Sequence, residues 1–255
     1  MKQTITDQNG IILYQGEHET LGDAVEVAVK KGVSLRGAEL PNVNLERKNL
    51  TGGDFREANV KEGNFSMTRL THSDFSKANL HGAKMSGSNL RVSTFEEANL
   101  MFASMDDVVA TNSNFTKANL TKAIAYDSYF MFSKAPGALF TEAELCGSKF
   151  NGSNFQGSDF TKADLWGAVM AGGNFSNCQF RGANLKEVNG QKANFDGASM
   201  EGVDRSGSNF AGSMFDPAPI KKEIQSVETS NALDAAFAET KRSGANQVAG
   251  IQKTL

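Results

Sequence analysis

The sequence is poor in the residues that stabilise or interrupt most folds of its size. Its 255 residues include only two cysteines, four prolines and one tryptophan, whereas glycine (25 residues) and phenylalanine (18) are abundant. This composition favours a thin, regular core over a large globular one. Cys146 and Cys178 fall on outward and inward positions, respectively, of the pattern described below. We therefore expect no disulfide between them and favour a reducing compartment.

Long apolar runs are also missing. None approaches the roughly 20 residues that a membrane span requires, and the N-terminal residues lack the apolar core of a signal peptide. We expect a cytoplasmic protein with no membrane partner. The formal net charge is -3 and no basic stripe is evident, so direct nucleic-acid binding is not expected either.

No constellation of side chains typical of catalysis or metal binding is present. The three histidines, His18, His72 and His81, fall on different elements or faces of the expected fold. Neither cysteine has a ligand-bearing neighbour at the spacing of a metal site, and the glycines follow a repeat instead of a phosphate-binding motif. We expect no enzyme activity, no cofactor and no metal.

What the sequence does have is a five-residue repeat from residue 33 to residue 215. Counting in fives from Leu35, 32 of 37 positions are Leu, Phe, Met or Val, without an insertion or deletion. A small residue usually lies two positions before each of these centres, and Asn or Asp most often lies one before it. A period of five fits neither an α-helix nor a β-strand, so the chain must turn at every repeat. The exceptional centres are Ala110, Ala125, Ala135, Gly190 and Arg205.

These repeats resemble the pentapeptide repeat family, whose motif is Ala, Asp or Asn, Leu and two variable residues. The resemblance implies an all-β solenoid, a right-handed quadrilateral β-helix with four pentapeptides, or 20 residues, per coil. Residues 33–215 would then form about nine coils and a rod about 45 Å long, given the ~4.8 Å spacing of neighbouring strands. The motif is seen at Ala58-Asn59-Val60, Ala78-Asn79-Leu80, Ala98-Asn99-Leu100 and Ala183-Asn184-Leu185.

The sequence itself supports a coil of 20 residues. Every fourth centre from Leu35 should then lie in one column, and eight of these ten residues are Phe. Such constancy indicates side chains that stack from coil to coil. The column contains Phe55, Phe75, Phe95, Phe115, Phe155, Phe175, Phe195 and Phe215.

Both ends depart from the repeat, and we divide the chain into residues 1–32, 33–217 and 218–255. In the first segment, Asn9-Gly10 predicts a hairpin turn, Thr20 with Asp23 predicts a helix start, and Gly32 predicts its end. This hairpin and helix would cap the first coil, since an uncovered β-edge promotes aggregation; alternatively, they bind a partner. The last segment predicts helices that cap the stack or make a dimer, as C-terminal segments of family members can.

Arg205 is an anomaly because it occupies an inward centre. A buried guanidinium without a partner is prohibitively unfavourable. We therefore expect the coil to open at Arg205, or an acidic residue such as Asp204 or Glu223 to reach it.

Apolar residues at positions that should face water form the candidate site. An exposed apolar patch usually marks a protein interaction surface, and 20-residue stacking brings these residues onto adjacent faces. An alternative is that Ala125, Ala135 and Pro136 signal a local bulge, in which some of the side chains turn inward. The candidate partner-binding residues are Val109, Ile124, Tyr126, Tyr129, Met131, Phe132, Trp166 and Val169.

We therefore predict a non-enzymatic rod that binds a protein partner, or a second copy of itself, through this patch. The resemblance implies a second interpretation, because certain family members mimic DNA and bind type II topoisomerases such as gyrase. Residues 33–215 contain 19 acidic and 18 basic residues, a poor imitation of a duplex with one charge per ~1.7 Å. A third interpretation is a structural component of a larger assembly. The segment before Leu35 also looks like that of bacteriophage-encoded members, which suggests a host machine as the partner.

Overall fold

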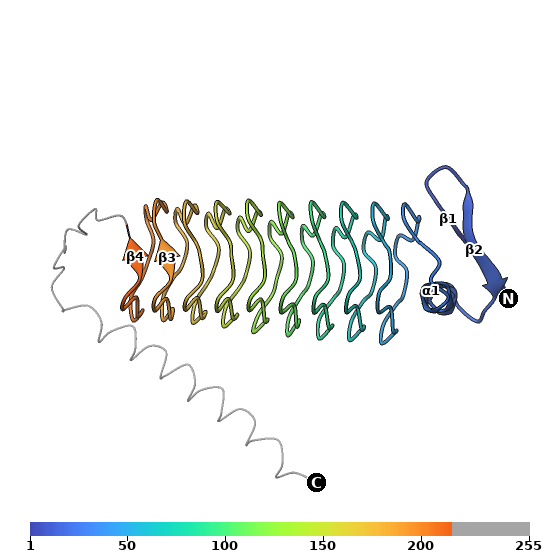
Figure 1. Cartoon of the computed structure of the whole chain (residues 1–255), viewed down its shortest axis with the longest axis horizontal. Coiled ribbons are helices and arrows are strands. Elements are labelled where there is room, and N and C mark those ends of the chain that lie inside the picture. The colour runs from blue at the N-terminus through green and yellow to red at the C-terminus, as the bar shows by residue number, and fades with distance from the viewer. Residues whose placement is uncertain (216–255) are drawn as a thin grey trace, which may run out of the picture. The chain divides into compact units, whose positions relative to one another are not determined.

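The computed structural model describes residues 1–215, which lie within one compact unit. This part of the chain consists of a β-hairpin, a helix and a stack of coils (Figure 1). Within it, no helix has the length and apolar character of a membrane span. The predicted C-terminal segment, residues 218–255, lies outside the described residues, as does Glu223.

The N-terminal segment folds into the predicted hairpin and helix. Strand β1 (Lys2–Thr6) pairs antiparallel with β2 (Ile12–Glu17). Helix α1 (Leu21–Lys30) begins at a complete capping box between Thr20 and Asp23, which satisfies amide groups that the first turn leaves without partners. After the C-cap the chain turns at Gly32, whose φ of 72° lies in the left-handed region where glycine carries no steric penalty.

The N-terminal segment packs against the first coil. The buried face of α1 belongs to the same apolar core as the coils. At Gly22 the helix comes so close that a β-carbon would stand 2.2 Å from the Asn44 carbonyl oxygen. The Lys48 ammonium pairs with Asp23 and Glu26 of α1. The Glu39 amide donates to the Thr6 carbonyl at 2.8 Å, so the hairpin contributes a backbone contact as well.

Each coil is made of four five-residue units. A unit has two turn residues, an inward small residue, an outward residue that forms a β-bridge, and an inward centre. Bridges join residues 20 apart, from Glu39 with Asn59 onward, and end in the parallel pair β3 (Asn194–Phe195) and β4 (Met214–Phe215). The 20-residue register predicted from the Phe column is therefore confirmed.

The corners require a left-handed backbone. The second turn residue has a positive φ throughout the stack, with Gly152 at 62° and many side-chain-bearing residues between 51° and 60°. Glycine adopts this conformation freely, whereas a β-branched residue is strained there. Val92, with φ of 59°, is such a strained corner.

The inward centres form the core, where they stack in columns from coil to coil. Every apolar centre from Leu35 to Phe195 is buried, and neighbouring Phe rings stack, as Phe75 and Phe95 do with centroids 5.3 Å apart. Ala135 interrupts the column that contains Phe75 and Phe95. There Phe130, from the adjacent column, contacts Phe115 edge-on at 5.6 Å, so an aromatic contact is retained beside the small centre.

The last described coil is more exposed than the others. Met200, Arg205, Phe210 and Phe215 are half-buried instead of buried, and the Arg205 guanidinium carbon lies 5.7 Å from the Phe215 ring centroid. The prediction that the coil opens at Arg205 is wrong, because residues 201–215 keep the turns and bridges of the other coils; Arg205 is half-buried because no described coil covers it. The alternative pairing with Asp204 is wrong, because Asp204 pairs with Lys186 at 3.0 Å.

Candidate functional site

The predicted partner-binding residues all lie on the outside of the stack. Tyr126 and Tyr129 are each 39% exposed, Trp166 is 53% exposed and Phe132 is 60% exposed. The predicted alternative of a local bulge is wrong: residues 121–140 repeat the same turns and bridges as their neighbours, and Ala125 and Ala135 are buried in regular coils. The other four predicted residues are half-buried, namely Val109, Ile124, Met131 and Val169.

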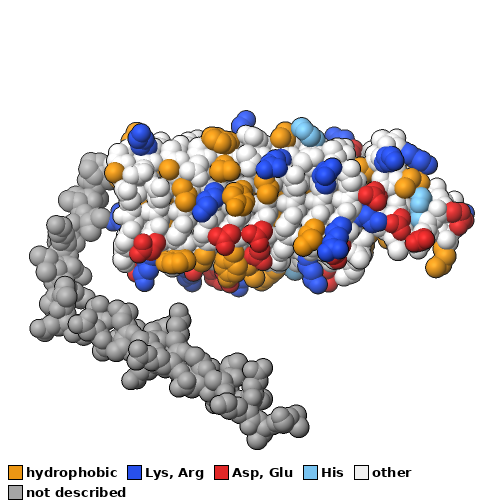
Figure 2. Space-filling view, turned by 90° about the horizontal axis from the view of Figure 1, so that it is seen from below, with side chains coloured by type: hydrophobic (Ala, Val, Ile, Leu, Met, Phe, Trp, Pro, Cys, Tyr) orange, Lys and Arg blue, Asp and Glu red, His pale blue; other side chains and the backbone are white. Residues whose placement is uncertain are grey.

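These residues occupy one face of the stack, its two corners and the edge of the next face. Val109 bridges to Tyr129, Tyr129 to Lys149, and Lys149 to Val169, so they form one ladder. Because residues 20 apart lie about 4.8 Å from each other, the ladder is a continuous strip. Figure 2 looks onto a face of the stack on which apolar side chains gather near the middle, next to acidic side chains.

We call this set the aromatic surface. Tyr126 and Trp166 form the corner before the ladder, and Met131 and Phe132 form the corner after it. Ile124 lies in the neighbouring ladder, between Ser104 and Glu144. The eight predicted residues are thus brought together, although what they bind remains a prediction.

Carboxylates border the aromatic surface. The Asp106 carboxylate accepts a hydrogen bond from the Tyr126 amide at 3.1 Å, and the Asp164 carboxylate accepts one from the Trp166 amide at 3.1 Å. Burial, together with the charge of Asp107, raises the pKa of Asp106 above its ordinary value. Carboxylates therefore lie close to one another on this surface.

Cys146 lies in the same corner column as Tyr126 and Trp166 and is half-buried. Burial and the neighbouring Asp164 carboxylate raise the pKa of its thiol to about 11. The thiol is therefore protonated near neutral pH and is a weak nucleophile. Cys178 is buried, as predicted, and contacts the Phe155 carbonyl.

Five further exposed apolar residues of the coils are not among the residues predicted from the sequence. They occupy outward positions that the repeat identifies, so the signal was available in the sequence. Val92 lies in the column of Phe132, whereas Phe102 lies on a different corner, where its ring is 5.4 Å from His81 and 5.8 Å from the Lys122 ammonium. The five are Met67, Val92, Phe102, Leu139 and Met214.

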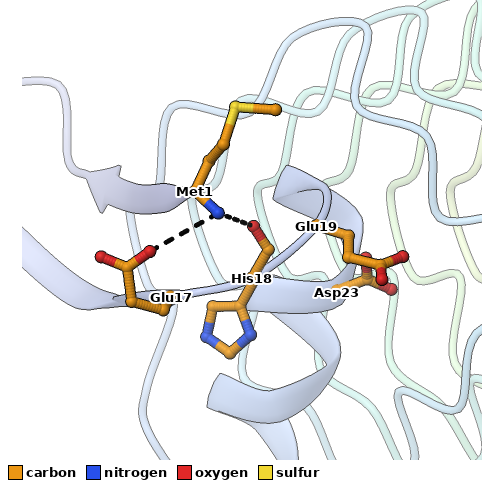
Figure 3. Close-up of a pocket in the computed structure, with 5 residues that line it drawn as sticks. All are labelled: Met1, Glu17, His18, Glu19 and Asp23. Carbon is orange, nitrogen blue, oxygen red and sulfur yellow. Dashed lines mark hydrogen bonds and ion pairs between the residues drawn. The ribbon is translucent and has the colours of Figure 1, made fainter.

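A hollow in the N-terminal segment is lined by Met1, Glu17, His18, Glu19 and Asp23. The Met1 amino group pairs with Glu17 at 3.5 Å and donates to the His18 carbonyl at 3.1 Å (Figure 3). Asp23, on the same hollow, is held by Thr20 and Lys48. These contacts belong to the fold. Across residues 1–215, no group of three or more His, Cys, Asp or Glu residues is arranged to hold a metal ion.

Solved structures of pentapeptide repeat proteins share features with this chain. HetL of the cyanobacterium Nostoc, involved in heterocyst differentiation regulation, is 22% identical, with 78% of this chain and 98% of that chain covered and a TM-score of 0.43. Full-length QnrB1, a plasmid-mediated fluoroquinolone resistance protein, is 15% identical, with 80% and 96% covered and a TM-score of 0.33. Scores this low say nothing about function.

The family itself follows from the sequence. No curated protein sequence matches the chain, but the family described as pentapeptide repeats matches residues 31–66, 54–91, 93–130, 138–177 and 174–212, with eight copies. These matches cover well over half of the chain and coincide with the stack of four-sided coils. The protein therefore belongs to the pentapeptide repeat family and folds as a right-handed quadrilateral β-helix.

Proposed function

We propose that this protein is a non-enzymatic interaction protein that presents the aromatic surface to a protein partner. The observation that carries the proposal is the exposure of Tyr126, Tyr129, Phe132 and Trp166 on one face and its corners. Tyrosine, tryptophan and phenylalanine are enriched at protein interfaces, and such anchors contribute most of the binding energy there.

The backbone beneath these side chains favours tight binding. The Tyr129 amide donates to the Val108 carbonyl at 2.8 Å, and the Ala110 amide donates to the Tyr129 carbonyl at 2.8 Å. Both bonds join Tyr129 to the preceding coil, and the amide of the adjacent Phe130 donates to the Lys149 carbonyl of the following coil at 2.8 Å. A surface that is already ordered loses little conformational entropy on association, so more of the contact energy appears as affinity.

Mimicry of DNA toward a topoisomerase is a weaker candidate. It needs continuous rows of negative charge, whereas cations pair with carboxylates across neighbouring coils. Lys122 lies 3.4 Å from Glu142, and Lys77 lies 3.9 Å from Glu97. Such pairs neutralise much of the stack, so a host protein met through the aromatic surface, a second copy of the chain or a place in a larger assembly accounts better for the pattern.

The test is a double substitution, Tyr129→Ser with Trp166→Ser. Both side chains are exposed, so thermal unfolding should hardly change. Self-association in sedimentation experiments, or capture of a specific protein from bacterial lysate, should weaken by well over tenfold, since each anchor contributes more than about 2 kcal/mol. Phe102→Ser with Leu139→Ser is the matched control, because these exposed residues lie on other columns. A destabilised double variant that associates normally would refute the proposal.

A further inference from the structure

We infer that the occupant of the aromatic surface is a basic segment of a partner protein, one that carries arginine or lysine among apolar residues. This inference rests on the function proposed above and adds the chemistry of the partner. It follows from which charges surround the aromatic residues, and from what those charges do and do not contact.

The carboxylates that surround the aromatic residues lie in a block of sixteen outward positions, four on each of four successive coils. The block starts at residues 104, 106, 107 and 109 and continues 20, 40 and 60 residues later. It holds five carboxylates and one lysine, Lys149, around seven apolar residues. We call it the acidic block, and its carboxylates are Asp106, Asp107, Asp127, Glu144 and Asp164.

This charge is specific to the block. The other outward and inward residues between 33 and 215 contribute fourteen carboxylates and seventeen cations, an excess of positive charge. In the two coils before the block, the same four columns hold Arg69 and Lys84 but no acid. The negative field is therefore centred on the aromatic residues.

The carboxylates of the block are available. None of the five forms an ion pair with a residue of the described chain, whereas nine of the fourteen carboxylates elsewhere in the stack do. Burial raises the pKa values of Asp106 and Cys146, and a neighbouring carboxylate raises each of them further: Asp107 acts on Asp106, and Asp164 acts on Cys146. A cation from a partner would meet these carboxylates without having to displace an existing ion pair.

The corner also leaves room for a partner's side chain. Residues 147 and 167 are glycines, so no side chain separates Trp166 from the ladder of Tyr129 and Val169. A β-carbon at Gly167 would meet nothing within 4 Å, while the Asp127 carboxylate lies against Gly147. A guanidinium group can stack on an aromatic ring and bind a carboxylate at its edge, and this corner supplies both groups in Trp166 and Asp164, whose carboxylate accepts from the Trp166 amide.

Charge disfavours the competing occupants. In a symmetric dimer the same patch meets itself, so the five carboxylates and single lysine of one acidic block would face an identical set. Like charges placed against each other across an interface disfavour association. A nucleic acid would be repelled for the same reason.

The test uses the full-length protein and labelled peptides, with binding measured by fluorescence anisotropy. The probe is a peptide of alternating arginine and leucine, and its control has glutamate in place of each arginine. We expect the arginine peptide to bind and the glutamate peptide not to bind. Replacing the carboxylates by amides in Asp107→Asn with Asp127→Asn should weaken binding by about threefold to tenfold, as expected for the loss of exposed charge pairs. Raising the salt concentration should weaken it as well.

The matched control is Glu62→Gln with Glu142→Gln, which removes two carboxylates from left-handed corner positions of another column. Its affinity for the peptide should stay within about twofold of the parent. Failure of the arginine peptide to bind, or equal affinity in both amide variants, would overturn the inference. If the Tyr129 and Trp166 substitutions still abolish protein association in that case, the proposed function stands and only the basic character of the partner is refuted.

Discussion

The ring of Phe132 occupies the space that a β-carbon would need at Gly152, one coil further along the stack. A β-carbon at residue 152 would stand 2.8 Å from Cε1 of Phe132, closer than real β-carbons approach. Phe132 lies at a left-handed corner and is 60% exposed, and its ring packs against Gly152. One edge of the aromatic surface thus depends on a missing side chain.

Gly152→Ala should therefore destabilise the protein more than Gly157→Ala. Both substitutions force alanine into a left-handed backbone, at φ of 62° and 69°, which costs roughly 1–2 kcal/mol. Only the first also displaces Phe132, since nothing lies within 4 Å of a β-carbon at residue 157. We expect a further loss of about 1 kcal/mol in chemical denaturation. Adding Phe132→Ser should remove this difference, and its persistence would contradict the contact.

Phe95→Ala should lower the free energy of unfolding by ~3–5 kcal/mol, because it leaves a cavity in the stacked column. Phe95 is fully buried, and its ring stacks on Phe75 and Phe115. The control is Asn99→Ala, which removes an outward amide that accepts from the Met101 amide at 3.2 Å and should cost about 1 kcal/mol. Equal shifts of the denaturation midpoint would refute the inward assignment.

Val92→Gly should stabilise the protein. Val92 is 48% exposed and has φ of 59°, a conformation that costs an L-residue roughly 1–2 kcal/mol. Glycine relieves this strain but loses more conformational entropy on folding, so the net gain should be about 0.5–1 kcal/mol. The adjacent Arg91→Gly lacks the strain to relieve and should lower the melting temperature. A destabilised Val92→Gly would mean that its side chain makes contacts worth more than the strain.

Asp23→Asn should reduce the loss of stability in acid. Hydrogen bonds from Lys48, and next from Thr20, lower the pKa of Asp23 from 3.8 to about 2. A carboxylate whose pKa is lower in the folded state stabilises the fold above its ordinary pKa, and this stabilisation disappears as the pH falls through the folded value. Between pH 3.8 and about 2 the parent should therefore lose more stability than the variant. Asp196→Asn is the control, since its carboxylate forms no ion pair within the described chain; denaturation midpoints that fall equally in all three proteins would contradict the linkage.

The repeat in the sequence determined most of the architecture. A centre every fifth residue can be buried only if the chain turns at each unit, and a Phe every twentieth residue fixes the register of the coils. The inward assignments, the outward position of Cys146 and the capping of α1 at Thr20 were all predicted, because each depends on neighbours in the sequence or on a strict period. Arg205 was recognised as an exception for the same reason.

The candidate site was predictable only in part. Periodicity places Tyr129 and Val169 in one ladder, but it cannot say whether small centres such as Ala125 and Ala135 draw their neighbours inward. That outcome depends on packing between coils. In the structure the neighbouring side chains stay outward, and Phe130 contacts Phe115 beside the small centre. The tertiary structure likewise decides which carboxylates are paired. Ion pairs depend on how far long side chains reach across neighbouring coils, and within residues 1–215 no such side chain pairs with Asp107 or Asp127.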